Sequence, residues 1–462
     1  MDHPPRKAED RSLEHEPAAS SGNISSGVHA PAPPVKLLGF WKVPFFYGWV
    51  IVGAVFVAEF VAGGVGSLVL PLFFKAISTE MGWSLTLLTG IVTAQTFAHA
   101  AVGPGLGPLL DRFGAKPVMV FGAIIAGLGF LALTRVQEIW QFWLLYAMVG
   151  ALGLHEMGGF TGPVLITKWF VRSRGKAMAT ATLATTLGGA IMAPVLGYLI
   201  TNFGWRYTLG VMGIGLMVIV IPIALLFIRR QPEDMGLLPD GDTAPSTIPG
   251  KGPVRTARAE VSWTVKEALR SRTFWLLVIA INLVHLAGNT VIFHLVPFLT
   301  LQQGLSAQAA GLVLTMRLAS STLSRPLWGW ATDRFPMRNC LAVGFVSRSL
   351  GALVLLFLPF PINIGALIIT NLPGAGQGML QNLAFAQYYG RRYSGAIQGI
   401  AKPFTVISSM LGPLIISVMF DLTGTFTMIF VIASCMGIIG SVVVLWATPP
   451  VKKSTPAESV TV

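Results

Sequence analysis

The chain has 462 residues, of which 53% are hydrophobic and 11% are charged. Soluble globular domains carry about 25% charged residues, so this composition excludes an ordinary soluble protein. The long apolar segments agree, because Glu59 is the one charged residue between Phe45 and Phe74. A helix needs about 20 apolar residues to cross a bilayer, and the sequence therefore predicts a polytopic α-helical membrane protein.

Hydropathy predicts twelve membrane-spanning helices. In chain order the expected ranges are 46–73, 84–108, 117–134, 139–167, 177–201, 206–228, 273–300, 306–330, 339–359, 362–387, 395–420 and 425–447. Both termini then fall on one side, together with 25 of the 32 lysine and arginine residues. Because loops rich in these residues stay in the cytoplasm, we expect cytoplasmic termini. The net charge of +13 thus reflects topology, not a nucleic-acid partner.

The sequence has two long polar stretches, one before the first predicted helix and one that separates two six-helix bundles. The mixed charges of the first residues favour a disordered cytoplasmic tail over a signal peptide. The second stretch ends in a segment, 263–272, that predicts a short interfacial helix. The expected parts are a tail over 1–44, an N-terminal bundle over 45–228, a cytoplasmic linker over 229–271, a C-terminal bundle over 272–448 and a second tail over 449–462.

The two halves repeat a loop motif. Gly107-Pro-Leu-Leu-Asp111-Arg112-Phe follows the second predicted helix, and Gly329-Trp-Ala-Thr-Asp333-Arg334-Phe follows the eighth. After the fourth and tenth helices, an aromatic pair, two basic residues and a glycine also return at nearly the same offset. Such duplication is typical of transporters in which two bundles rock about a central site. We therefore interpret the Asp/Arg loops as gating elements; the alternative is a turn that only sets topology.

These features resemble the major facilitator superfamily over about residues 40–450. Shorter motifs, Phe46-Tyr47-Gly48-Trp49-Val50, Lys168-Trp169-Phe170 and Arg325-Pro326-x-x-Gly329, are similar to those of the monocarboxylate transporters and oxalate:formate antiporters. The resemblance implies an all-α fold of two pseudo-repeat bundles and alternating-access transport of a small organic carboxylate. It implies no cofactor.

Two buried cations are the expected substrate ligands. Arg325 precedes Asp333 by eight residues, which places it about 12 Å from the cytoplasmic turn, and Lys402 lies at a similar depth in the eleventh helix. Two cations at one level repel unless an anion lies between them, and arginine binds a carboxylate in a bidentate manner. In the resembled family an arginine on the eighth helix holds the carboxylate, and the oxalate relatives add a lysine on the eleventh. The alternative is a pair of bases that extend to the interface.

Three further charges lie within predicted helices. Arg317, nearer the centre of the eighth helix, is a further candidate ligand, and Glu59 is its expected partner. This pair is either a structural salt bridge or one that substrate or a proton breaks. Arg348 lies on the ninth helix, which is peripheral in the resembled fold, so we expect a structural or interfacial role.

Glycine and proline interrupt the fourth and tenth helices at corresponding places, which points to a site near the membrane midplane. His155 and Glu156 lie in the first of these interruptions. We expect Glu59 and Glu156 to take part in proton coupling, with His155 as a relay; a structural hydrogen bond is the alternative. In the monocarboxylate relatives an aspartate one turn before the family arginine is linked to coupling, and here that place is Ser321, so the same route is in doubt.

The sequence has no Walker loop, no nucleophile elbow and no spacing of metal ligands, so we expect neither an ATP-driven pump, nor an enzyme, nor a metalloprotein. We predict a proton-coupled carboxylate transporter that works as a monomer in the cell inner membrane. Two alternatives stay open. One is proton-driven efflux of a hydrophobic compound, suggested by 28 Phe and 17 Met residues; the other is a membrane sensor with a transporter fold.

Overall fold

The computed structural model describes residues 35–37, 41–43, 45–66, 69–241, 262–423 and 427–451. In the unit from Ala32 to Val462, most of the described residues lie in helices. The N-terminal half contains α1 (Gly48–Val65), α2 (Pro71–Met81), α3 (Leu85–Phe113), α4 (Ala115–Leu133), α5 (Ile139–Met148), the π-helix η1 (Val149–Gly159), α6 (Thr161–Trp169), α7 (Arg174–Phe203) and α8 (Trp205–Phe227). The C-terminal half contains α10 (Arg272–Pro297), the π-helix η4 (Phe298–Gln302), α11 (Ala307–Thr332), α12 (Met337–Phe357), α13 (Ile362–Gly374), α14 (Gln377–Tyr389), α15 (Ser394–Thr423) and α16 (Thr427–Trp446).

Each predicted span falls on one helix or on a run of consecutive helices. The fourth and tenth spans are interrupted near their middle: α5, η1 and α6 form the fourth, and α13 and α14 form the tenth. Both interruptions fall on segments that contain several glycines or a proline, residues 150–159 in the fourth span and 371–378 in the tenth. By length and composition, six of the described helices can cross a membrane: α1, α4, α7, α8, α12 and α16.

The polar segments carry short elements. Strands β1 (Val35–Leu37) and β2 (Trp41–Val43) form an antiparallel pair within the stretch expected to be disordered, and residues 1–34 lie outside the described part. The linker contains the 3₁₀-helices η2 (Pro232–Met235) and η3 (Pro239–Gly241), followed by α9 (Val265–Arg270). Helix α9 confirms the predicted short helix, and it begins at a capping box between Thr264 and Glu267.

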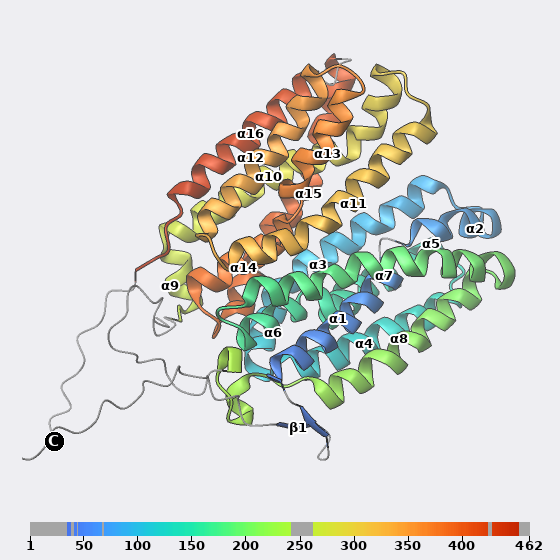
Figure 1. Cartoon of the computed structure of the whole chain (residues 1–462). Helices are drawn as coiled ribbons and strands as arrows, with labels where there is room; N and C mark the ends of the chain where they lie inside the picture. The colour runs from blue at the N-terminus through green and yellow to red at the C-terminus, as the bar shows by residue number, and fades with distance from the viewer. Residues whose placement is uncertain are drawn as a thin grey trace, which may run out of the picture. The chain divides into compact units, whose positions relative to one another are not determined.

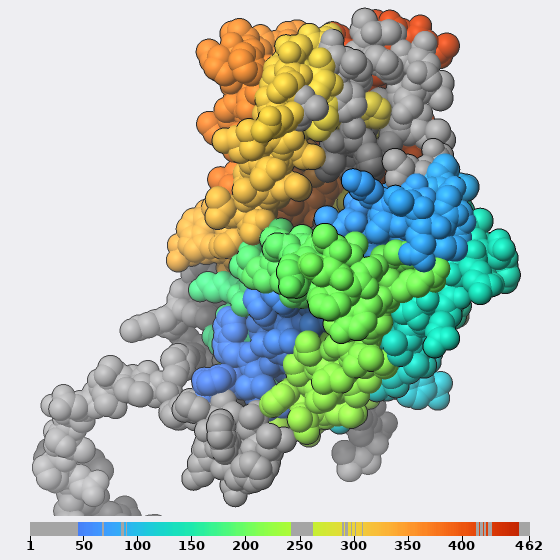
Figure 2. All heavy atoms as spheres, turned by 90° about the vertical axis from the view of Figure 1, so that its right-hand side faces the viewer, coloured from blue at the N-terminus to red at the C-terminus, as the bar shows by residue number. Residues whose placement is uncertain are grey.

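The two halves meet along two helix pairs, α3 with α15 and α7 with α11 (Figure 1). Glycines let the backbones of these pairs approach closely. A Cβ atom on Gly399 would lie 2.6 Å from the carbonyl oxygen of Gly103, and a Cβ on Gly107 would overlap the carbonyl oxygen of Gly395. Figure 2 shows the second pair from outside, where the green surface of α7 meets the yellow surface of α11.

The motif glycines are therefore contact points between the halves. In the second pair, a Cβ on Gly329 would lie 3.0 Å from the carbonyl oxygen of Gly175. The repeated G-x-x-x-D-R motif thus places a glycine of each half against the backbone of the other. Each motif aspartate follows its glycine by one helical turn, so it lies at the end of the same interface.

Replacing Gly107 by alanine tests this packing. We expect Gly107→Ala to lower the thermal unfolding temperature, because the new methyl group overlaps Gly395 and overpacking costs about 1–3 kcal/mol. Gly105→Ala is the matched control, since a Cβ on Gly105 meets no atom within 4 Å and alanine favours a helix. Equal unfolding temperatures for the two variants in one detergent would refute the close contact.

Candidate functional site

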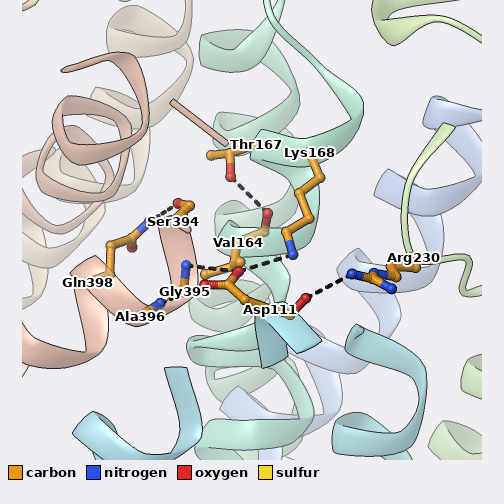
Figure 3. A network of polar contacts seen from close by, with 9 residues as sticks. All are labelled: Asp111, Val164, Thr167, Lys168, Arg230, Ser394, Gly395, Ala396 and Gln398. Carbon is orange, nitrogen blue, oxygen red and sulfur yellow. Dashed lines mark hydrogen bonds and ion pairs between the residues drawn. The ribbon is translucent and has the colours of Figure 1, made fainter. Parts of the chain in front are cut away.

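Asp111 connects the two halves at the end of α3 (Figure 3). Its carboxylate accepts hydrogen bonds from the backbone amides of Gly395, at 3.2 Å, and Ala396, at 2.8 Å. These amides belong to the first turn of α15, where backbone N–H groups have no partner inside the helix. Lys168 of α6 forms an ion pair with the same carboxylate at 3.1 Å, and both side chains are 8% exposed. Asp111 therefore caps a helix of the opposite half.

Asp333 makes the reciprocal contact at the end of α11. Its carboxylate accepts hydrogen bonds from the backbone amides of Gly175, at 2.8 Å, and Lys176, at 3.4 Å, in the first turn of α7. Burial raises the pKa of Asp333, while the two amides and the charge of Lys176 lower it. A negative charge at a helix N-terminus is favourable. Each half thus supplies the carboxylate that caps a helix of the other half.

Arg174 and Arg391 add hydrogen bonds to backbone carbonyl oxygens at the same end of the molecule. Arg174 is buried and donates to the carbonyl oxygens of Phe170, at 2.6 Å, Thr167, at 3.1 Å, and, across the interface, Ala386, at 3.4 Å. Arg391 donates to the carbonyl oxygen of Lys168 at 2.9 Å. These two arginines therefore tie α6 to α14 and to the segment that precedes α15.

Sequence reasoning missed Asp240. The side chain of this linker residue accepts hydrogen bonds from the backbone amides of Val171, at 2.9 Å, Arg172, at 2.8 Å, and Ser173, at 3.2 Å. The linker is thereby fastened to the segment immediately before α7. Asp240 has a φ of 58°, and the Pro-Asp-Gly sequence around it is a turn signal that predicts such a conformation.

The two motif arginines lie apart from these contacts. Arg112 is exposed beside the ring of Phe113, 5.2 Å from its centre, and Arg334 is exposed 4.7 Å from the centre of the Trp330 ring. Within the described part of the chain, neither arginine is paired with an acid at this end. The aspartates, rather than the Asp/Arg pairs, join the halves.

Deeper in the N-terminal half, Glu156 lies on η1. It is 1% exposed, and neither carboxyl oxygen has a hydrogen-bond partner. Bulges of π-helix often occur at functional sites, and glycines surround this one: a Cβ on Gly122 would lie 3.1 Å from the Cβ of Glu156. An isolated buried carboxyl group is costly, so its surroundings must include a compensating charge or a proton.

Lys402 of the C-terminal half supplies a charge near Glu156. The two groups interact electrostatically, and the charge of Lys402 also acts on His155 and His99. Close packing explains how α15 brings the lysine there, because a Cβ on Gly103 of α3 would lie 3.7 Å from the Cβ of Lys402. The rings of His99 and His155 have their centres 3.6 Å apart, and their planes are tilted by 49°. This contact was not predicted, because the two residues are far apart in the sequence.

Glu59 interacts with a hydroxyl group and, electrostatically, with a cation other than the predicted one. Its carboxylate accepts a hydrogen bond from the Thr185 hydroxyl at 2.7 Å and interacts electrostatically with Arg325. The predicted ion pair of Glu59 with Arg317 does not occur among the ion pairs of the described residues. The structure corrects that pairing, since depth along a helix, which the sequence gives, does not fix the direction of a side chain. Arg325 and Lys402 thus each have an acid from the other half nearby.

Arg317 and Arg348 form a cationic pair within the C-terminal half. Arg317 is 5% exposed, and the Nε atoms of both arginines are buried without a hydrogen-bond partner. The two charges repel each other. Arg348 lies against α10, where a Cβ on Gly288 would overlap its guanidinium group. Of the two roles expected for Arg348, structural or interfacial, this contact favours the structural one, because the side chain points into the half, toward α10.

Polar side chains near these two arginines form hydrogen bonds between helices of the C-terminal half. Asn371 of α13 donates to the carbonyl oxygen of Arg317, at 3.0 Å, and to the hydroxyl group of Ser321, at 2.9 Å. His285 of α10 and Gln381 of α14 are joined at 3.3 Å. Ser321 thus orders α13 against α11 in the structure. Among the described residues, no group of three or more His, Cys, Asp or Glu side chains is placed to bind a metal.

Removing the charge of Asp111 tests the contact between the halves. We expect Asp111→Asn to lower the thermal unfolding temperature, because it leaves Lys168 as an unpaired buried cation, a loss of about 3 kcal/mol. Adding Lys168→Met should recover part of the loss, since it removes the unpaired charge. Asp234→Asn, on the exposed η2, is the control. Equal effects of Asp111→Asn and Asp234→Asn would contradict the ion pair.

Comparison with known proteins agrees with this architecture. The family model described as Major Facilitator Superfamily matches residues 55–385 and 277–460. The chain is 24% identical to human monocarboxylate transporter 11 over 86% of this chain and 82% of that protein, and 26% identical to the multidrug resistance protein MdtG of Dickeya zeae, over 81% and 87%. The crystal structure of FucP in the outward conformation has the same fold, with a TM-score of 0.66 at 15% identity over 87% of this chain and 98% of that one. The chain therefore belongs to the major facilitator superfamily of membrane transporters.

Proposed function

We propose that the protein is a secondary active transporter that carries a small organic carboxylate by alternating access, coupled to protons, in the cell inner membrane. The observation that carries this proposal is that Glu156, buried in one half without a hydrogen-bond partner, lies within electrostatic reach of Lys402, which the packing of α15 against Gly103 brings in from the other half. A cation that faces a buried acid in the empty protein can exchange that acid for the carboxylate of a substrate. The human monocarboxylate transporter relative supports the substrate class.

The coupling follows from charge balance. When a carboxylate binds Lys402, Glu156 loses its compensating charge while it remains buried. A proton on Glu156 then removes the cost of an isolated buried carboxylate. Arg325 and Glu59 form a second pair of this kind, and Arg317 adds a buried cation for a substrate with a second acidic group. His155 beside Glu156 completes the proposed proton route.

The alternating step needs one end of the interface to open and close. We infer that the crossed caps of Asp111 and Asp333 hold the cytoplasmic end closed, with both termini and the linker on that side. This assignment rests on the predicted twelve spans and the distribution of basic residues. Opening then breaks four amide hydrogen bonds and exposes the N-terminal amides of α7 and α15 to water.

Efflux of a hydrophobic compound is the second candidate, because the chain also resembles MdtG of Dickeya zeae, described as a multidrug resistance protein. The two candidate functions differ in the charge of the transported solute and in the direction of its transport. Labelled lactate, pyruvate, oxalate and a lipophilic cation, tested in proteoliposomes with and without a pH step, separate them. Accumulation of an acid supports the carboxylate proposal, and extrusion of the cation alone supports efflux.

The buried cations should be essential for carboxylate transport. We expect Lys402→Gln and Arg325→Gln each to lower uptake of an accepted carboxylate at least about tenfold, the worth of one charge-assisted hydrogen bond. Arg135→Gln, an exposed cation between α4 and α5, should leave uptake unchanged. Normal uptake by both buried-site variants, at equal reconstitution, would exclude this binding site.

Glu156 should be essential for coupling rather than for binding. We expect Glu156→Gln to abolish uptake driven by a pH gradient and to retain exchange of labelled for unlabelled carboxylate, because glutamine cannot release a proton. Glu138→Gln, at the exposed start of α5, is the control. If the Glu156 variant still accumulates substrate against a gradient when a pH step is applied, Glu156 is not the coupling group.

A further inference from the structure

A polar cavity of about 520 Å³ lies at the end of the molecule that carries Asp111. Its walls come from four parts of the chain: the end of α3, the end of α6, the linker after α8, and the segment before α15. The charged residues among its lining are Asp111, Lys168, Arg230, Glu233, Arg391 and Arg392. The transport proposal gives this cavity no role, because it lies beyond the caps and not between the buried cations.

The charges of the lining do not balance. Lys168 is paired with Asp111, and Arg391 is paired with Glu233. Arg230 donates to a backbone oxygen, the carbonyl of Asp111, at 3.1 Å (Figure 3). Arg392 is exposed, 5.5 Å from the centre of the Tyr393 ring. The lining therefore has an excess of two positive charges, carried by guanidinium groups that no acid of the described residues neutralises.

The size and the donor groups fit a phosphate-bearing anion. A volume of about 520 Å³ lies within the range of small-molecule sites. Guanidinium groups bind phosphate through two parallel hydrogen bonds and are only weakly hydrated. A monovalent carboxylate would leave one of the two excess charges unbalanced, whereas a dianionic phosphate group balances both.

The position of the cavity means that a bound ligand affects the conformation of the interface between the halves. Its walls include Asp111 of one half and Arg391 and Arg392 of the other, so they are assembled when Asp111 caps α15. A ligand that prefers one conformation shifts the population toward it. We propose that this cavity binds a phosphate-bearing anion and thereby holds the Asp111 end of the interface closed. The proposal does not depend on which solute is transported.

Pyrophosphate binding to the full-length protein tests the proposal. In nanodiscs of a zwitterionic lipid, we expect saturable pyrophosphate binding by calorimetry and a matching rise in unfolding temperature. Arg392→Gln should weaken binding about tenfold, the loss expected for one charge-assisted contact. Arg392 is exposed and caps no helix, so this variant should fold normally. Arg270→Gln on α9, an exposed cation outside the lining, should bind as the unmodified protein does.

A second arm separates a soluble ligand from a lipid headgroup. Nanodiscs that contain phosphatidic acid, whose phosphomonoester can carry two negative charges, should raise the unfolding temperature without pyrophosphate if the source is a headgroup, and Arg392→Gln should remove the rise. Binding or stabilisation that depends on Arg392 in either arm supports the site and identifies its source. If neither arm shows stabilisation, or if Arg392→Gln and Arg270→Gln behave alike in both, the proposal is wrong.

Discussion

The unsatisfied amides at the start of a helix are the constraint on which the closed end of this structure depends. In a helix the first N–H groups have no internal acceptor, and near a membrane the loss of a hydrogen bond is costly. Helices α7 and α15 begin at the interface between the halves, and each finds its acceptor on the other half, at Asp333 and Asp111. The caps are therefore also the contacts that join the halves.

Inside the molecule, too, charged groups of one half interact with groups of the other half. Glu59 and Glu156 belong to the N-terminal half, and Arg325 and Lys402 to the C-terminal half. Their attraction favours the empty closed arrangement without adding a rigid link, since each cation can exchange its acid for another anion. A carboxylate that binds there competes with an acid of the protein. In the proposed mechanism, substrate binding and the release of an acid from its cation are therefore one event, and a proton neutralises the released acid.

Much of the fold could be predicted from the sequence because hydropathy and glycine placement are local signals. The composite fourth and tenth helices follow from Gly150 to Gly159 and from Pro373, and the repeated motif identified Asp111 and Asp333 as a related pair. Their partners could not be predicted, because the capped amides lie in the other half, far along the chain. The motif therefore suggested a local Asp/Arg turn, whereas the structure shows a contact between halves.

The side-chain pairs inside the helices were harder to predict, for a geometric reason. Sequence spacing gives the depth of a residue but not the neighbour that it faces, so Glu59 was assigned to Arg317 although Arg325 is the cation that interacts with it. The contact of Arg348 with α10 could not be predicted either, because Gly288 makes room for the guanidinium group only where α10 and α12 pack together. Asp240 was missed because its acceptor role depends on how the linker folds back onto the chain.

Hydrogen–deuterium exchange at the first turns of α7 and α15 tests the crossed caps most directly, because those amides have no acceptor within their own helices. We expect a crossed pattern: Asp111→Asn speeds exchange at Gly395 and Ala396 in the C-terminal half and leaves Gly175 and Lys176 slow, while Asp333→Asn does the reverse. Exchange at both turns that is unaffected by either substitution would contradict the account, since the amides would then owe their protection to something other than the opposing carboxylates.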